Sequence, residues 1–209
     1  MKVYTVGEDD VTRAVLRRIL HYCNKNIEIV SELPARGGQI SGKLREFDRL
    51  SAYLPVILLV DLDTHSCAPE LLQKLFPDGK NNRFIVNIAV DEAEAWLMAD
   101  RQGFSDYFAI DIEEIPKAKP LKQGGNKALV EMGVPLKSSL YLMSRLIPKS
   151  RNADYKKQLT PLKNAKKGPE YNDCIVPFIQ EKWDIETARK NSNSLNRMIE
   201  RITECSFET

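Results

Sequence analysis

Apolar and polar positions in the first half of the chain follow a pattern in which short strands and amphipathic helices alternate. Runs of β-forming residues predict the strands, and apolar residues spaced three and four apart predict the helices between and after them. The expected strands are Lys2–Val6, Ile27–Val30, Val56–Val60 and Arg83–Val90, and the expected helices are Asp9–Tyr22, Ser41–Leu54, Pro69–Phe76 and Glu92–Asp100. This order predicts an α/β fold with a parallel sheet flanked by helices and right-handed crossovers.

Two local features support this pattern. The segment Val56–Val60 is a continuous run of apolar β-formers, as expected for a strand that is buried on both faces of a parallel sheet. Gly37 and Gly38 interrupt the chain before the second helix, and Ser41 is expected to cap that helix.

The pattern changes after Asp100, where prolines separate polar segments from further helical ones. The expected helices here are Ser138–Leu146, Asp173–Trp183, Ile185–Lys190 and Ser194–Thr203. We therefore expect an α/β domain over residues 1–100 and a mainly helical C-terminal region over residues 101–209.

Composition places the chain among ordinary globular proteins, because 43% of its 209 residues are hydrophobic and 29% are charged. It contains no run near the ~18 apolar residues that span a bilayer, and its start lacks an apolar signal core. Its four cysteines have no spacing typical of a zinc site. These features predict a cytoplasmic protein with free thiols and no membrane partner.

The net charge of +2 conceals an uneven distribution of charged residues. Residues 144–167 contain eight Lys and Arg residues and one acid, Asp154. Such a segment could bind nucleic acid or a protein partner, or it could be a solvated lysine-rich loop. Tyr155 and Tyr171 could stack on bases, although "GPEYN" favours a tight turn with Tyr171 packed beneath it. The candidate contacts are Arg145, Lys149, Arg151, Lys156, Lys157, Lys166 and Lys167.

Asp61 and Asp63 directly follow the longest apolar run in the chain. In a parallel sheet, ligands bind beyond the carboxyl ends of the strands, and residues two apart point the same way if the strand continues. Two carboxylates there suit Mg²⁺ or Mn²⁺. The alternative is that Asp61 ends the strand and Asp63 caps the following turn.

Two further acidic groups also follow predicted strands. Glu8, Asp9 and Asp10 come after the first strand, and an Asp-Glu-x-Glu group that ends at Glu94 comes after the fourth. Acids in the first turn of a helix are favoured by its dipole, so both groups have a structural explanation. The first strand of a doubly wound sheet usually lies centrally, however, so its tip could face the tip that carries Asp61.

The first-loop acids and the later Asp pair together resemble the TOPRIM domain of topoisomerases, primases and OLD-type nucleases. That domain has an apolar strand ending in Glu-Gly, a following acid, and a later strand ending in D-x-D. Gly7 matches the glycine, Asp10 matches the following acid, and Asp61 and Asp63 match the D-x-D. The TOPRIM glutamate would fall at Val6, which cannot carry out acid–base chemistry.

Nearly the whole chain resembles a family of small uncharacterised bacterial TOPRIM-like proteins. The shared stretches are the glycine pair, "LVDLDTHSCAPELL", "IAVDEAEAWLMAD", "KKGPEYN" and "NSNSLNRMIERI". Among them, "AEAWLMAD" and "GPEYN" are more specific than the D-x-D pattern.

The resemblance implies a Mg²⁺- or Mn²⁺-dependent nuclease in a bacterial or phage-defence setting, acting beside an ABC-type ATPase. The alternative is a non-catalytic scaffold that binds an ATPase partner or nucleic acid. The sequence leaves the oligomeric state open, including a homo-oligomer. The implied metal ligands are Asp61, Asp63 and Asp10, and the implied catalytic residues are Glu8, Asp10, Asp61, Asp63 and Glu94.

Overall fold

The computed structural model describes residues 1–63, 65–120, 129–135 and 137–205. It forms two compact units. The first comprises Met1–Ala89 and the described residues from Arg197 onward, and the second comprises Val90–Asn196. The sequence pattern placed a boundary near residue 100, whereas the units divide after Ala89 and the last helix returns to the first unit.

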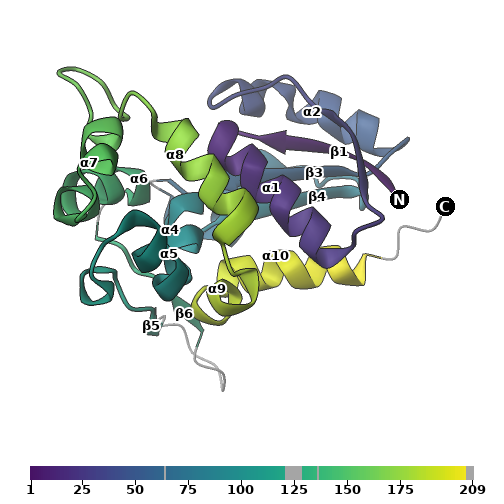
Figure 1. Cartoon of the computed structure of the whole chain (residues 1–209). Coiled ribbons are helices and arrows are strands. Elements are labelled where there is room, and N and C mark those ends of the chain that lie inside the picture. Colours follow the sequence, from purple (N-terminus) through teal and green to yellow (C-terminus); the bar gives the residue numbers. More distant parts are fainter. Residues whose placement is uncertain (64, 121–128, 136, 206–209) are drawn as a thin grey trace. The chain divides into compact units, whose positions relative to one another are not determined.

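A four-stranded parallel sheet forms the centre of the first unit, which confirms the predicted α/β class (Figure 1). Its strand order is β2-β1-β3-β4, so the first strand is central. The strands are β1 (Lys2–Gly7), β2 (Glu28–Glu32), β3 (Val56–Asp61) and β4 (Phe84–Ala89).

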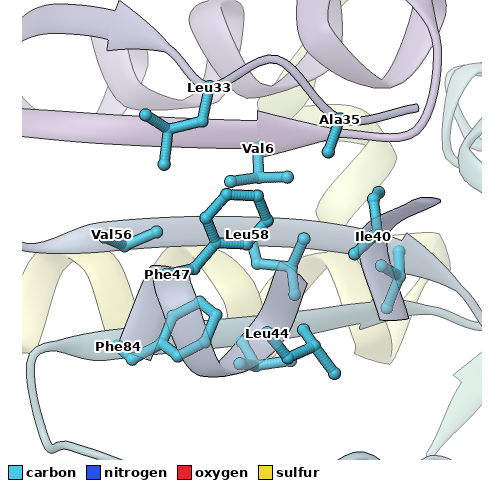
Figure 2. Close-up of a cluster of buried hydrophobic side chains, with 11 residues drawn as sticks. Val6, Leu33, Ala35, Ile40, Leu44, Phe47, Val56, Leu58 and Phe84 are labelled. Carbon is cyan, nitrogen blue, oxygen red and sulfur yellow. The ribbon is translucent and has the colours of Figure 1, made fainter. Parts of the chain in front are cut away.

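Helices cover both faces of this sheet. Side chains of α2 (Gln39–Ser51) and α3 (Ala68–Leu75) pack on the face that contains Val6 and Leu58, and Figure 2 shows part of this apolar cluster. Since side chains alternate along a strand, Val3 and Thr5 of β1 point to the opposite face. Helix α1 (Asp10–Cys23), whose apolar side chains are absent from this cluster, packs against β1 and β3 there.

The beginnings of the two long helices differ from each other. Asp9 caps α1 through a capping box, in which its carboxylate accepts the Thr12 N–H at 2.9 Å and its own N–H donates to the Thr12 hydroxyl at 2.8 Å. The predicted Ser41 cap of α2 is wrong. The helix begins after Gly38, and the Ser41 hydroxyl donates to the Gly38 carbonyl from inside the first turn.

The second unit is mainly helical, as predicted for the C-terminal region, and its core contains both tryptophans of the chain, Trp96 and Trp183. Two predicted helices continue as short π-helical segments, η2 and η4. Helix α10 enters the first unit at Arg197. The elements are α4 (Ala93–Ala99), α5 (Arg101–Phe108), η1 (Ile112–Glu114), β5 (Lys119–Pro120), β6 (Val130–Glu131), α6 (Ser138–Tyr141), η2 (Leu142–Leu146), η3 (Ile147–Lys149), α7 (Ala153–Leu159), α8 (Tyr171–Pro177), η4 (Phe178–Lys182), α9 (Ile185–Asn191) and α10 (Asn193–Glu204).

Within the described part of the chain, each helix is too short or too polar to cross a lipid bilayer. All four cysteines are free thiols, as the sequence predicted.

Candidate functional site

The strand order identifies the most favourable binding position in the first unit. The chain leaves β1 through α1 on one face of the sheet and reaches β3 through α2 on the other. The crossovers therefore diverge between β1 and β3, and in open α/β sheets ligands bind beyond the carboxyl ends of the strands at such a topological switch point. Glu8 directly follows β1, and Asp61 is the last residue of β3.

A hydrogen bond joins these two strand ends. The Asp61 backbone N–H donates to the Glu8 carboxylate at 3.2 Å. The backbone pairing of β1 with β3 ends at Gly7 and Leu59, so the Glu8 side chain supplies an acceptor just beyond the last paired residues. Both Glu8 and Asp61 are half-buried, which leaves them accessible to a ligand.

Gly7 allows the first turn of α1 to approach the end of β1. A Cβ atom at Gly7 would lie 3.0 Å from both the backbone nitrogen and Cγ of Arg13, which is too close for an ordinary contact. The Arg13 guanidinium donates to the carbonyls of Gly7, Leu33 and Ala35 at 3.1–3.4 Å. Arg13 thus fixes the strand end that precedes Glu8, a role that no motif in the sequence indicated.

Asp63 lies on a turn rather than on the strand. β3 ends at Asp61, and the His65 N–H closes a turn by donating to the Leu62 carbonyl at 3.1 Å. The backbone φ of Asp63 is +51°, in the left-handed region that aspartate tolerates better than most residues. The strand therefore does not continue far enough to align Asp61 with Asp63, although Asp63 is exposed beside the strand end.

The remaining acids of the first loop have structural contacts. Asp9 caps α1, as described above. The Asp10 carboxylate lies 2.8 Å from the guanidinium of Arg36 in an ion pair that is open to solvent. The helix-start explanation therefore holds for Asp9, which caps α1, and for Asp10, which lies in its first turn, although the Asp10 side chain remains accessible to solvent.

These carboxylates fit one kind of metal site and not another. No group of three or more His, Cys, Asp and Glu side chains that could enclose a metal ion is found among the residues that the structure describes, so Asp10, Asp61 and Asp63 do not form a complete cage. Mg²⁺, however, is commonly held by one or two carboxylates, with water and substrate phosphates completing its shell. Glu8 and Asp61 provide two carboxylates at neighbouring strand ends and fit that more open arrangement.

Val6, the residue at the position of the TOPRIM glutamate, belongs to the core. It is 1% exposed and points into the apolar cluster beneath α2 (Figure 2). A glutamate there would place an unpaired charge in an apolar environment, which is very costly.

Glu94 belongs to the second unit, where it is 4% exposed. Its carboxylate accepts a 2.6 Å hydrogen bond from the Tyr171 hydroxyl and lies 3.8 Å from the Lys167 ammonium group. The same ammonium group lies 4.5 Å from the centre of the Tyr171 ring, a cation–π contact. The stretches "AEAWLMAD" and "KKGPEYN" thus meet around one buried carboxylate.

Asp91 and Glu92 precede α4 with positive φ angles of 61° and 68°, which most residues other than glycine avoid. Hydrogen bonds hold both side chains. The Asp91 carboxylate accepts the Gly133 N–H at 2.8 Å, and the Glu92 carboxylate accepts the Ser139 N–H at 3.0 Å. Burial raises the pKa of the Asp91 carboxyl above its ordinary value.

A family model described as a domain of unknown function (DUF4276) matches residues 6–203. The chain belongs to the DUF4276 family. No curated protein and no solved structure matches the chain. The family description names no activity, and the match makes no specific link to the TOPRIM domain, so the TOPRIM-like interpretation of this DUF4276 chain remains a proposal.

The basic segment of the DUF4276 chain, residues 144–167, lies entirely in the second unit. Lys149 pairs with Glu114, and Lys167 pairs with Glu94. Tyr155 stacks on Tyr107 with ring centres 5.8 Å apart, so this ring contributes to an aromatic cluster of the protein. The other predicted contacts are exposed: Arg145, Arg151, Lys156, Lys157 and Lys166.

Proposed function

We propose that this chain is a metal-dependent nuclease that hydrolyses phosphodiester bonds at the carboxyl ends of β1 and β3. The main support is the hydrogen bond from the Asp61 N–H to the Glu8 carboxylate, because it holds an acidic side chain beside the neighbouring strand end at the switch point. Glu8 and Asp61 would hold Mg²⁺ or Mn²⁺, with Asp10 and Asp63 as further candidates. When bound, such a cation polarises the scissile phosphate and stabilises the leaving oxygen.

Glu8 is also the residue that we propose as the general base in place of the glutamate missing at Val6. A carboxylate can take a proton from an attacking water when it lies within hydrogen-bonding reach of that water. Glu8 is half-buried and held at the β3 end through its contact with Asp61, so its position is restrained while it remains accessible to solvent.

The wider setting follows from the TOPRIM-like resemblance rather than from the geometry. That resemblance supports a bacterial or phage-defence system in which the nuclease acts with an ABC-type ATPase. The exposed lysines of α7 and the following loop are the part of the second unit that we propose for nucleic acid, because clustered cations attract a phosphate backbone.

A second candidate function is a non-catalytic scaffold that binds an ATPase partner or nucleic acid. Two observations favour it. An apolar core residue replaces the TOPRIM glutamate at Val6, and Asp10, the acid that matches the TOPRIM pattern, is ion-paired with Arg36.

Calorimetric titration with Mn²⁺ tests the metal site. The variant Glu8→Gln/Asp61→Asn is expected to bind Mn²⁺ at least about tenfold more weakly than the wild type, since both carboxylates are removed. Its folding should be unchanged or improved, because like charges at one site repel. Asp78→Asn removes an exposed acid elsewhere in the same unit and serves as the matched control, and Asp63→Asn tests the second residue of the D-x-D pair.

Cleavage assays separate the two candidate functions. Plasmid, single-stranded DNA and transfer RNA are incubated with wild type and the double variant, with Mg²⁺ or with a chelator, and with or without the protein encoded by the neighbouring gene. Metal-dependent cleavage that the double variant loses supports the nuclease. Metal binding without cleavage of any substrate favours the scaffold, and equal Mn²⁺ affinity in both proteins removes the metal site from these strand ends.

A further inference from the structure

Arg36 follows β2, and both of its neighbours are fixed to the structure around Glu8. The Gly37 N–H donates to the Glu8 carbonyl at 3.1 Å. On the other side, the Arg13 guanidinium donates to the Ala35 carbonyl at 3.1 Å. Because Ala35 is buried and held in this way, the backbone of Arg36 is fixed beside the loop that carries Glu8.

The Arg36 side chain reaches an acid of the candidate site. Its Nη2 atom lies 2.8 Å from Oδ1 of Asp10, while 59% of the Arg36 side chain and 40% of the Asp10 side chain remain exposed. An ion pair that is this open contributes little to stability, so exchanging it for another partner costs little. A guanidinium can bind a phosphate through two parallel hydrogen bonds, as it binds a carboxylate, so a phosphate can take the place of Asp10.

The negative charge of the site favours a cationic side chain beside it. Glu8, Asp61 and Asp63 gather negative charge at the strand ends, and a nucleic-acid backbone is also negatively charged. A fixed cation beside these acids would offset the repulsion and position one phosphate. The nearby Arg13 is already engaged by three backbone carbonyls and is mostly buried, whereas Arg36 faces solvent.

We propose that Arg36 is the residue that binds a phosphodiester group of the substrate at this site, exchanging Asp10 for the phosphate. This inference rests on the proposed nuclease function and deepens it by assigning a substrate contact. Arg36 is a binding residue in this scheme and transfers no proton.

The test measures binding of a single phosphodiester, so that it depends on neither metal nor cleavage. Thymidylyl-(3′→5′)-thymidine is titrated by ³¹P NMR in the presence of a chelator against the wild type, Arg36→Ala and Arg36→Lys. Arg36→Ala is expected to weaken binding about five- to tenfold, and Arg36→Lys to restore part of the loss. Arg17→Ala is the matched control, because Arg17 is an exposed arginine of the same unit that pairs with Glu32.

Asp10→Asn distinguishes a phosphate contact from a purely structural ion pair. If Arg36 binds phosphate, releasing it from Asp10 should leave the affinity unchanged or increase it. An equal loss in Asp10→Asn and Arg36→Ala would show that the ion pair itself is what matters, and it would overturn the inference. Wild-type affinity in Arg36→Ala, or no binding by the wild type, would overturn it as well.

The experiments distinguish failure of this inference from failure of the proposed nuclease function. Phosphodiester binding that requires Arg36, in a protein that cleaves no nucleic acid, would support this inference while the nuclease proposal fails. Metal-dependent cleavage with the same KM in wild type and Arg36→Ala would leave the nuclease proposal standing and remove Arg36 from it.

Discussion

Replacing Tyr171 by phenylalanine should destabilise the second unit, although it removes only one oxygen atom. The Tyr171 side chain is buried, and its hydroxyl donates a 2.6 Å hydrogen bond to the buried carboxylate of Glu94. Hydrogen bonds to charged groups contribute about 1.5–3 kcal/mol, and a buried carboxylate that loses a donor also keeps its desolvation cost. We therefore expect the free energy of unfolding to fall by about 2 kcal/mol.

Tryptophan fluorescence reports this change selectively. Both tryptophans of the chain, Trp96 and Trp183, are buried in the second unit, so a urea titration followed by their emission monitors that unit. Tyr141→Phe is the matched control. Tyr141 is a half-buried tyrosine of the same unit, and its hydroxyl makes no hydrogen bond to any residue that the structure describes. Its loss should change the free energy of unfolding by less than about 0.5 kcal/mol.

A double-mutant cycle with Glu94→Gln identifies the source of the effect. Glutamine still accepts the hydrogen bond but carries no charge, so Tyr171→Phe in that background should cost only about 1 kcal/mol. If Tyr171→Phe costs no more than Tyr141→Phe in the wild-type background, the hydrogen bond to Glu94 does not stabilise the unit as we argue. An equal cost in both backgrounds would refute the contribution of the charge.

Two further predictions concern pH and salt. Burial raises the pKa of the Glu131 carboxyl, so the stability that this group contributes is fully present below its unfolded pKa, near 4.5, and is lost as the pH rises through its folded pKa. The free energy of unfolding, measured by tryptophan emission, should therefore decline less steeply from pH 5 to pH 8 in Glu131→Gln than in the wild type. An unchanged slope would contradict this. Changing the exposed Lys156, Lys157 and Lys166 to Gln should flatten the slope of the logarithm of the nucleic-acid binding constant against the logarithm of the salt concentration, by about 0.7–0.9 for each phosphate that is no longer neutralised. Lys167→Gln should change this slope less, because Lys167 pairs with Glu94. An unchanged slope in the triple variant would remove this segment from the interface.

The sheet of the first unit was predictable because its strands have simple patterns. β3 is buried on both faces and its sequence is an uninterrupted apolar run. The alternation of strands and helices then gave the parallel order with the first strand central. The helices of the second unit were harder to predict. Only Leu159 of α7 is buried, so its sequence lacks an apolar stripe, and α5 contains Gly103, which weakens a helical pattern.

The candidate site was predictable in part, because the strand order determines which strand ends are neighbours. Placing the first strand centrally brings the ends of β1 and β3 together, and Glu8 does contact Asp61. The alignment of Asp61 with Asp63 depended on a strand that in fact ends at Asp61. Arg36 could not be assigned, because its approach to Asp10 depends on how the loop after β2 folds, and local sequence pattern does not encode that path.

The acidic side chains of the chain differ in burial, and the buried ones have structural roles. In the second unit, Glu94 accepts from Tyr171, and Glu131 accepts from the Ser192 hydroxyl at 2.6 Å and from the Ser194 N–H. Each of these buried carboxylates joins segments that lie more than 60 residues apart in the chain. A buried carboxylate is tolerated only when such donors surround it.

The acids at the end of the first-unit sheet have a different environment. Asp61 and Glu8 are half-buried, and Asp63 is exposed, so water and a substrate phosphate can share a cation with them. The acidic stretch "VDEAEAW" is therefore explained by the packing of the second unit, although it overlaps "AEAWLMAD", which is more specific than the D-x-D pattern. The less specific Asp61–Asp63 pair lies where a ligand can reach it, and this is why the proposed chemistry is assigned to Glu8 and Asp61 and not to Glu94.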